Sequence, residues 1–258
     1  MATYLDRILD AHRAVAADDP RPLGALLDQA RGSDPTRGFR AALAAVEGLG
    51  VIAEVKRRSP SKGDLFVDLD PAAVAQAYET GGATCMSVLT DRDFFGGSAA
   101  DLAAARGACS LPVLRKDFTV CAADVCDARI MGADAVLLIA AALDDAELAD
   151  LHELASEIGL DALVEIHDEA ELERAVAVGA TLVGVNQRDL VTFEVDTDRA
   201  VRMAPQMPDG VVRVAESGVR GAEDARLLRE AGYHAVLVGE SLVTSGDPAG
   251  ATAALRSA

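Results

Sequence analysis

Residues 51–63 read VIAEVKRRSPSKG, an apolar strand that carries two opposite charges and then passes into a polar loop. In a strand, side chains two positions apart share a face, so Glu54 and Lys56 point the same way at the carboxyl end of the run. The following RRSPSKG is rich in charge, hydroxyl groups, Pro and Gly, which is typical of a loop. A buried ion pair seldom stabilises a fold better than apolar packing does. We therefore interpret Glu54 and Lys56 as functional, with a purely structural ion pair as the alternative.

The same unit, an apolar run followed by a polar loop and an amphipathic helix, repeats along the chain. The apolar runs predict eight strands, at 51–55, 84–89, 111–115, 134–140, 161–166, 181–185, 211–215 and 234–239. Helical spacing predicts helices at 71–80, 98–107, 121–131, 144–158, 168–178, 196–204, 221–231 and 247–256. Eight such units in 258 residues predict an α/β fold, a (β/α)8 TIM barrel. A doubly wound open sheet is the alternative, but it does not require eight even repeats.

The first 48 residues contain no strand–helix unit. Apolar spacing predicts helices at 4–18, 20–31 and 38–46, and Gly-Ser-Asp-Pro at 32–35 ends the second of them. No linker or shift in composition separates the later repeats. We therefore expect one domain, 1–258, with an N-terminal helical extension at 1–48 and the barrel at 49–258.

The composition limits the classes of partner. A net charge of −18 and a pI of about 4.5 repel nucleic acid and anionic membranes, so we expect neither as a partner. The N-terminus lacks the apolar core of a signal peptide, and no apolar run approaches the roughly 20 residues of a membrane span. The four cysteines form no C-x-x-C motif, which favours free thiols in a reducing compartment. These features predict a cytoplasmic protein.

In a TIM barrel the ligand site lies at the carboxyl ends of the strands. Polar or charged residues follow every predicted strand except the fourth, which ends apolar. Two of these strand ends carry glycines, in Ser217-Gly218 after the seventh and Gly239-Glu240 after the eighth. Barrel enzymes commonly bind phosphate at these two loops through backbone N–H groups. We therefore expect a phosphorylated small molecule as the ligand.

Lys116 and Glu165 end two predicted strands and are candidates for an acid–base pair. A lysine near another cation and away from water has a lowered pKa, whereas a poorly solvated carboxylate has a raised one. We expect these shifts for Lys116 and Glu165, with Lys56 as the neighbouring cation and with Glu54 and Glu216 balancing the charge.

The histidines do not indicate a metal site. His167 shares a face with Glu165 only if that strand continues so far, and the sequence EIHDEAEL favours a loop or helix-cap position instead. The other three histidines are scattered, and no Asp, Glu and His cluster of metal-ligand spacing occurs. We expect neither a metal nor another cofactor.

Several motifs along the chain resemble those of one known family. VIAEVKRRSPSKG is similar to the signature of indole-3-glycerol-phosphate synthases of the tryptophan pathway. The resemblance continues through SVLTDRDFFGGS at 87–98, LPVLRKDF at 111–118, GADAVLLIAAAL at 132–143, LVEIHDEAEL at 163–172, GVNQRDL at 184–190, VAESGV at 214–219 and VLVGESLV at 236–243. It implies decarboxylating and dehydrating ring closure of 1-(2-carboxyphenylamino)-1-deoxyribulose 5-phosphate to indole-3-glycerol phosphate. The N-terminal helices fit the substrate-covering extension of that family.

The resemblance also implies residue roles. Lys116 corresponds to the general acid at the carbonyl and Glu165 to the general base of dehydration. Lys56 corresponds to the group that meets the substrate carboxylate, and whether it or Lys116 donates the first proton stays open. Glu54 and Asn186 correspond to positioning groups. The implied contacts are with the carboxylate (Arg188), the anthranilate ring (Phe95, Phe118, Leu137, Leu237), the phosphate (Ser59, Gly218, Gly239, Glu240) and the ribulose (Glu216, Ser217).

Two other functions share this architecture: a sugar-phosphate isomerase or epimerase, and a catalytically inactive barrel used as a binding module. The set of two lysines and two carboxylates disfavours the first, and the complete set of polar strand ends disfavours the second. Glu240 departs from the family pattern, since some members have a small hydroxyl residue there. Its carboxylate would repel phosphate unless only its backbone N–H contributes. We expect a monomer, and weak association with other tryptophan-pathway enzymes stays open.

Overall fold

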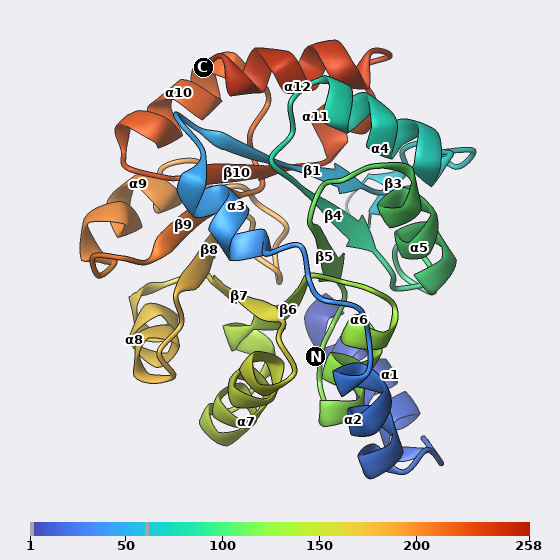
Figure 1. Cartoon of the computed structure of the whole chain (residues 1–258). Coiled ribbons are helices and arrows are strands. Elements are labelled where there is room, and N and C mark those ends of the chain that lie inside the picture. Colours follow the sequence, from blue (N-terminus) through green and yellow to red (C-terminus); the bar gives the residue numbers. More distant parts are fainter. Residues whose placement is uncertain (1–2, 60–61) are drawn as a thin grey trace.

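The computed structural model describes residues 3–59 and 62–258, and its strands close into a parallel barrel surrounded by helices (Figure 1). The strand order is β1-β10-β9-β8-β7-β6-β5-β4, and β1 pairs with both β10 and β4. The predicted TIM barrel is confirmed, with each strand boundary within two residues of its prediction. The strands are β1 (Gly50–Val55), β4 (Cys85–Leu89), β5 (Val113–Lys116), β6 (Ala135–Ile139), β7 (Asp161–Ile166), β8 (Leu182–Asn186), β9 (Val212–Glu216) and β10 (Ala235–Val238).

Helices connect the strands as predicted, and side-chain caps define the starts of several of them. Asp70 caps the helix that begins with Pro71, and Asp144 forms a reciprocal capping box with Glu147. The connecting helices are α4 (Pro71–Thr80), α5 (Ala99–Ala108), α6 (Ala122–Ile130), α7 (Asp145–Glu157), α8 (Glu169–Ala177), α9 (Arg199–Met203), α10 (Ala222–Glu230) and α12 (Pro248–Arg256).

Several short elements differ from the prediction. The loop after β1 contains a hairpin, β2 (Arg58–Ser59) with β3 (Gly63–Asp64), while Pro60 and Ser61 of the predicted loop lie outside the described residues. The site-facing loop after β10 contains α11 (Glu240–Val243), and two 3-10 turns, η1 (Ala140–Ala142) and η2 (Ala204–Gln206), follow β6 and α9. The helix predicted from residue 196 begins only at Arg199, because the Asp196 side chain accepts from the Asp198 N–H in a turn.

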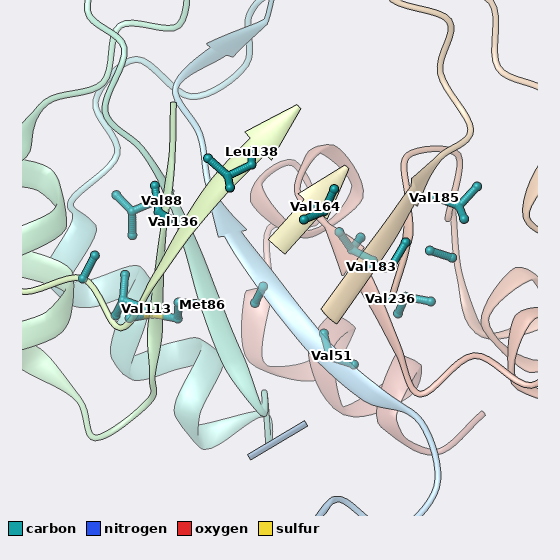
Figure 2. Close-up of a cluster of buried hydrophobic side chains, with 14 of the residues drawn as sticks. Val51, Met86, Val88, Val113, Val136, Leu138, Val164, Val183, Val185 and Val236 are labelled. Carbon is teal, nitrogen blue, oxygen red and sulfur yellow. The ribbon is translucent and has the colours of Figure 1, made fainter. Parts of the chain in front are cut away.

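Side chains of the strands alternate between two apolar layers. One layer faces outward and packs against the helices, with buried members from α4, α5, α7 and α10. Figure 2 shows its strand side chains, which include Val51, Met86, Val88, Val113, Val136, Leu138, Val164, Val183, Val185 and Val236. This layer explains why the strands have apolar residues even at positions that do not face the barrel interior.

The second layer fills the barrel interior. It contains Ile52, Leu114, Leu163 and equivalent residues of the other strands, together with Phe39 and Leu43. Phe39 and Leu43 belong to α3 (Phe39–Ala45) and are 0% and 1% exposed, so this helix closes the end at which the strands begin. At the opposite end the inward positions become polar, which leaves that end for a ligand.

The N-terminal extension runs from one end of the barrel to the other (Figure 1). Its first helix, α1 (Tyr4–Ala17), lies over the loops at the carboxyl ends of the strands, where Arg13 pairs with Glu147 at 2.6 Å. Its second helix, α2 (Leu23–Arg31), packs beside α6, where Arg21 pairs with Asp127 at 2.8 Å. The extension thus joins the helix that plugs the barrel to a helix at the opposite rim.

Two further predictions can be compared with the structure. All four cysteines are free thiols, and two of them are buried. Among the described residues, every helix is too short or too polar to span a lipid bilayer.

Candidate active site

A cavity of about 860 Å³ lies among the loops at the carboxyl ends of the strands. This volume is within the range of small-molecule sites. The structure brings together every residue that the sequence predicted for the site, from all eight strand ends. The cavity is lined by Glu54, Lys56, Ser59, Phe95, Lys116, Phe118, Leu137, Glu165, Asn186, Arg188, Glu216, Ser217, Gly218, Leu237, Gly239 and Glu240.

Lys116 lies at the centre of the polar residues. It is the last residue of β5, and its Nζ is 3.0 Å from Glu165 Oε2 and 3.8 Å from Glu216 Oε2. The other oxygen of Glu165 accepts a hydrogen bond of 3.0 Å from Asn186 Nδ2. Glu165 and Glu216 are 1% and 2% exposed. One ammonium and two carboxyl groups therefore share a site that is almost closed to water.

This geometry reverses the predicted pKa shifts. Burial acts to lower the pKa of Lys116, but the charges of Glu165, Glu216 and Glu54 outweigh burial and raise it. Burial acts to raise the pKa of Glu165, but Lys116 and then His167 lower it to about 2. The predicted lowered pKa of Lys116 and raised pKa of Glu165 are therefore wrong for this structure. The reason is that the two groups contact each other directly.

Glu216 is the carboxyl group with the raised pKa. Burial is the main cause, and the negative charge of Glu165 adds to it, so the pKa of Glu216 lies well above its usual value. Its Oε1 has no hydrogen-bond partner among the described residues. The backbone of Gly184 on β8 lies against this carboxyl group, and a Cβ atom at Gly184 would overlap Glu216 Oε1. Of the three carboxyl groups at the site, Glu216 is thus the one suited to hold a proton.

Lys56 forms a second ion pair, with Glu54. Lys56 Nζ is 2.6 Å from Glu54 Oε1, which confirms that the two side chains share one face of β1 and its continuation. Glu54 is 4% exposed, and its other oxygen accepts a hydrogen bond of 3.4 Å from Ser87. Lys56 is therefore held by a carboxylate, and carboxylates rather than Lys56 determine the pKa of Lys116.

Apolar side chains form one wall of the cavity. The rings of Phe95 and Phe118 lie with centroids 6.1 Å apart and planes inclined by 40°. Leu137 and Leu237 continue this wall and are buried. The structure adds apolar lining residues that the sequence did not single out: Leu89, Ile139, Leu190, Phe193, Val195, Val219 and Val238.

The loops after β9 and β10 form the other end of the cavity. Ser217 and Gly218 have φ of +65° and +78°, and Gly239 precedes α11, so backbone N–H groups border the cavity here. The hydroxyl of Ser59 is buried without a hydrogen-bond partner among the described residues. Lys62, which was not among the residues predicted for the site, lies 3.6 Å from the carboxylate of Glu240. This lysine balances the charge of Glu240, the one departure at the predicted phosphate site.

The sequence is matched by the family model for indole-3-glycerol phosphate synthase over residues 5–255. The chain belongs to the indole-3-glycerol phosphate synthase family. It is 58% identical to the indole-3-glycerol phosphate synthase of Nocardioides sp. over 228 residues, which cover 88% of this chain and 85% of that protein. It is 50% identical to that of Mycolicibacterium smegmatis over 259 residues, covering 100% and 95%. For that of Chlorobium luteolum the identity is 48% over 253 residues, covering 97% of each.

The family resemblance seen in the motifs is therefore confirmed, and with it a decarboxylating lyase of tryptophan biosynthesis. Two solved structures share the fold alone. Thiamine phosphate pyrophosphorylase from Pyrococcus furiosus has a TM-score of 0.61 at 17% identity, covering 81% of this chain and 94% of that one. An N-acetylmannosamine-6-phosphate 2-epimerase from Clostridium perfringens has a TM-score of 0.62 at 14% identity, covering 79% and 91%.

His167 lies beside the indole-3-glycerol phosphate synthase motif residues, in the loop that precedes α8. The strand ends at Ile166, as the loop interpretation requires, yet His167 Nε2 is still 3.7 Å from Glu165 Oε1. Its Nδ1 lies 3.1 Å from the carboxylate of Glu171. Burial acts to lower the pKa of His167, but Glu171 and Glu165 outweigh it and raise the pKa. His167 is thus a loop residue that supports Glu165.

A cluster of one histidine and two carboxylates lies next to the aromatic wall and contradicts the predicted absence of such a cluster. One ligand-type atom each from His12, Asp91 and Asp117 lies within 4.8 Å of the others. Sequence spacing did not reveal it because His12 is on α1, 79 residues before Asp91. Asp117 also pairs with Arg115 at 3.0 Å, so the cluster already contains a fixed cation.

Proposed function

We propose that this chain closes the indole ring of indole-3-glycerol phosphate, starting from 1-(2-carboxyphenylamino)-1-deoxyribulose 5-phosphate and releasing carbon dioxide and water. The observation that carries the proposal is the position of Lys116, between two buried carboxyl groups and next to both an aromatic wall and a loop pair suited to phosphate. One cavity thus supplies an acid, a base, a surface for an aryl ring and an anchor for the phosphorylated end.

Ring closure requires an acid at the ketone of the substrate. Lys116 donates a proton to the ketone oxygen while the aryl carbon that bears the carboxylate attacks the ketone carbon. A carbon–carbon bond forms, and the oxygen becomes a hydroxyl group. The raised pKa of Lys116 keeps its ammonium charged until the substrate arrives, as an acid requires. Lys56 and Arg188 hold the substrate carboxylate.

Decarboxylation follows from the charge that ring closure leaves on the aniline nitrogen and its ring. The bond to the carboxylate breaks, and its electron pair returns to the ring system, which neutralises that charge. The hydrocarbon side chains of the cavity wall offer no hydrogen bond to the carboxylate; they belong to Phe95, Phe118, Leu137 and Leu237. Their apolar surface therefore favours loss of the group as neutral carbon dioxide.

Dehydration completes the indole. Glu165, which is ionised in the structure with a pKa of about 2, accepts the proton removed from the ring system. Lys116 gave up its proton in ring closure, so Lys56 donates the proton with which the hydroxyl group leaves as water. Asn186 fixes Glu165 through its hydrogen bond, and Glu54 fixes Lys56 through its ion pair. Glu165, the carboxylate of one ion pair, thus removes the ring proton, and Lys56, the ammonium of the other ion pair, protonates the leaving hydroxyl group.

The other proposed assignments concern the phosphate and ribulose contacts, the cellular location and the oligomeric state. Ser59, Gly218, Gly239 and the N–H of Glu240 bind the phosphate, and Glu216 and Ser217 contact the ribulose chain. We also propose a cytoplasmic monomer that binds no nucleic acid, with weak association with other tryptophan-pathway enzymes left open.

The direct test is product formation from the carboxyphenylamino substrate, read by the appearance of indole fluorescence. The protein has no tryptophan, so its own background is low. Lys116→Met keeps the length of the side chain and removes the charge, and it should lower kcat about 10²- to 10⁴-fold, the usual contribution of a general acid. No product at high concentration of the unmodified protein would reject the proposed function. A Lys116→Met variant with near-normal kcat would remove Lys116 from the acid role.

A further inference from the structure

The cluster of His12, Asp91 and Asp117 links the N-terminal extension to the aromatic wall of the cavity. His12 Nε2 lies 2.9 Å from Asp91 Oδ2 and 3.8 Å from Asp117 Oδ1. The His12 ring also packs on Phe118, with centroids 5.5 Å apart. His12 is the residue of α1 that contacts both strand-end carboxylates, which are themselves 5% exposed.

Asp91 transmits this contact to the second phenylalanine. Its Oδ1 accepts hydrogen bonds from the N–H groups of Phe94 and Phe95, at 2.7 and 2.9 Å. Its Oδ2 is the atom that meets His12. Asp91 therefore fixes the backbone of Phe95 through one carboxylate oxygen and contacts His12 through the other.

Asp117 has a parallel arrangement for Phe118. Its Oδ1 accepts a hydrogen bond of 2.9 Å from the Phe118 N–H, and its Oδ2 is held by Thr90 and by Arg115. The imidazole of His12 thus stands between two carboxylates that each fix the backbone of a pocket phenylalanine. Arg115 supplies one positive charge for the two negative charges, and a protonated His12 supplies the second.

We propose that His12 is a positioning residue that sets the spacing of Phe95 and Phe118 and thereby tunes binding of the substrate's aromatic ring. It does so through Asp91, through Asp117 and through its own ring packed on Phe118. The identity of that aromatic ring as an anthranilate rests on the proposed function above. A metal ion is the rival occupant of the cluster, and the test below separates the two.

Protonation of His12 gives the proposal a distinct pH signature. The groups that face it are Asp91 from the loop after β4, Asp117 from the end of β5 and Asp124 from α6, with Arg115 behind Asp117. Burial acts to lower the pKa of His12, but these carboxylates outweigh it and raise the pKa. The ionic contact is therefore complete below pH 6.5 and is lost as the pH rises through the raised pKa of His12. Affinity for the aromatic ring should fall over the same window.

The test measures binding of anthranilate itself, through its fluorescence, together with steady-state kinetics. His12→Ala should weaken anthranilate binding and raise KM by roughly tenfold, the effect of losing one hydrogen bond to a charged group. The value of kcat should stay within about twofold, because His12 does not contact the reacting atoms. His12→Gln should recover part of the affinity, since its amide can donate to Asp91, but without the pH dependence of the unmodified protein.

His152→Ala is the matched control, because His152 is on α7 outside the cavity and should leave binding unchanged. Burial acts to lower the pKa of His167, but Glu171 and Glu165 outweigh it and raise that pKa too, so the signature is the difference between the pH profiles of the unmodified protein and His12→Gln. Equal anthranilate affinity for His12→Ala and the unmodified protein would overturn the proposal. Affinity that is lost on adding EDTA would also overturn it, in favour of a metal. Because anthranilate binding needs no turnover, the test still decides the role of His12 if synthase activity is absent.

Discussion

At the scale of single residues, the site depends on how three carboxyl groups and two lysines divide the charge. Glu165 and Glu54 each contact one lysine, and Glu216 remains as the carboxyl group with the raised pKa. The sequence predicted which side chains meet, because all of them end strands of one parallel barrel. It could not predict which acid holds the proton, because that depends on separations of about 3 to 4 Å between residues of β5, β7 and β9.

The raised pKa of Glu216 leads to a prediction about stability. A carboxyl group whose pKa is raised by folding lowers the free energy of unfolding as the pH rises above its pKa in the unfolded chain, near 4.5. Below that pH it does not destabilise the fold. Glu216→Gln removes this cost while keeping the shape. It should raise Tm at pH 8, and each kcal/mol of cost removed corresponds to roughly 2–4 °C for a chain of this size.

Thermal unfolding at pH 8 and pH 4 tests this prediction, with turnover measured in parallel. The gain in Tm should shrink toward pH 4, where the unmodified carboxyl group is protonated in both states. Turnover should fall even as Tm rises, because Glu216 lines the cavity beside Lys116. A Tm at pH 8 that falls below that of the unmodified protein would show that Glu216 is ionised in the folded state.

Gly184 gives a second prediction at this scale. A methyl group at Gly184 would overlap the Glu216 carboxyl group, so Gly184→Ala should displace Glu216 and lower kcat. Overpacking of this kind costs roughly 1–3 kcal/mol of stability. The double variant Gly184→Ala with Glu216→Ala should recover the stability but not the activity.

Gly107 is the control for Gly184. It lies in α5, and a Cβ atom there meets no atom within 4 Å. Gly107→Ala should leave kcat unchanged and keep or raise Tm, since alanine favours a helix over glycine by roughly 0.5–1 kcal/mol. If Gly184→Ala retained full kcat, the carboxyl position of Glu216 would not matter for turnover.

At the scale of elements, the loop after β9 carries the strongest local requirement. Gly218 has φ of +78°, and a Cβ atom there would also press on Val195. Gly218→Ala should therefore distort the loop and raise KM by about 10- to 100-fold, as expected from lost hydrogen bonds to a phosphate. Inorganic phosphate should bind more weakly as well, which a competition assay can measure.

Gly210→Ala separates this effect from backbone strain alone. Gly210 has φ of +84° and lies at the other end of β9, and a Cβ atom there would meet no other atom within 4 Å. Both variants should lose stability because alanine is disfavoured at positive φ. Only Gly218→Ala should weaken phosphate binding. A similar KM for the two variants would mean that the Ser217-Gly218 loop is only a turn.

Some helices and strands could be predicted from the sequence, and others could not. The eight strands and eight helices of the barrel could be predicted because apolar period and caps such as Asp70 and Asp144 determine them locally. The short α11 (Glu240–Val243) and the β2–β3 hairpin could not, because neither has an apolar period of its own. The family resemblance implied that the N-terminal helices cover the substrate, but the contact of His12 with Asp91 was hidden, because it forms only after the barrel has closed.

At the scale of the whole molecule, two layers of apolar side chains and the plugging helix α3 leave one end of the barrel open within residues 3–59 and 62–258. The N-terminal extension contributes to both ends, with Phe39 in the barrel interior and His12 at the rim. A chain with this arrangement couples its site to the packing of its first helices. Apolar packing stabilises the folded chain, whereas the net negative charge of the surface destabilises it, because like charges repel one another.

The net charge of −18 therefore predicts a specific salt response. At pH 8, raising NaCl from about 0.01 to 0.5 M should raise Tm, because the Debye length falls from about 30 Å to a few ångströms and repulsion between surface carboxylates is screened. At pH 4.5, near the pI of about 4.5, the same salt should have little effect on Tm. The buried pairs of Lys116 and Lys56 are shielded from solvent ions, so kcat at saturating substrate should change little over the same range. A fall in Tm with salt at pH 8 would mean that surface ion pairs such as Arg13–Glu147 and Arg21–Asp127 outweigh the net repulsion.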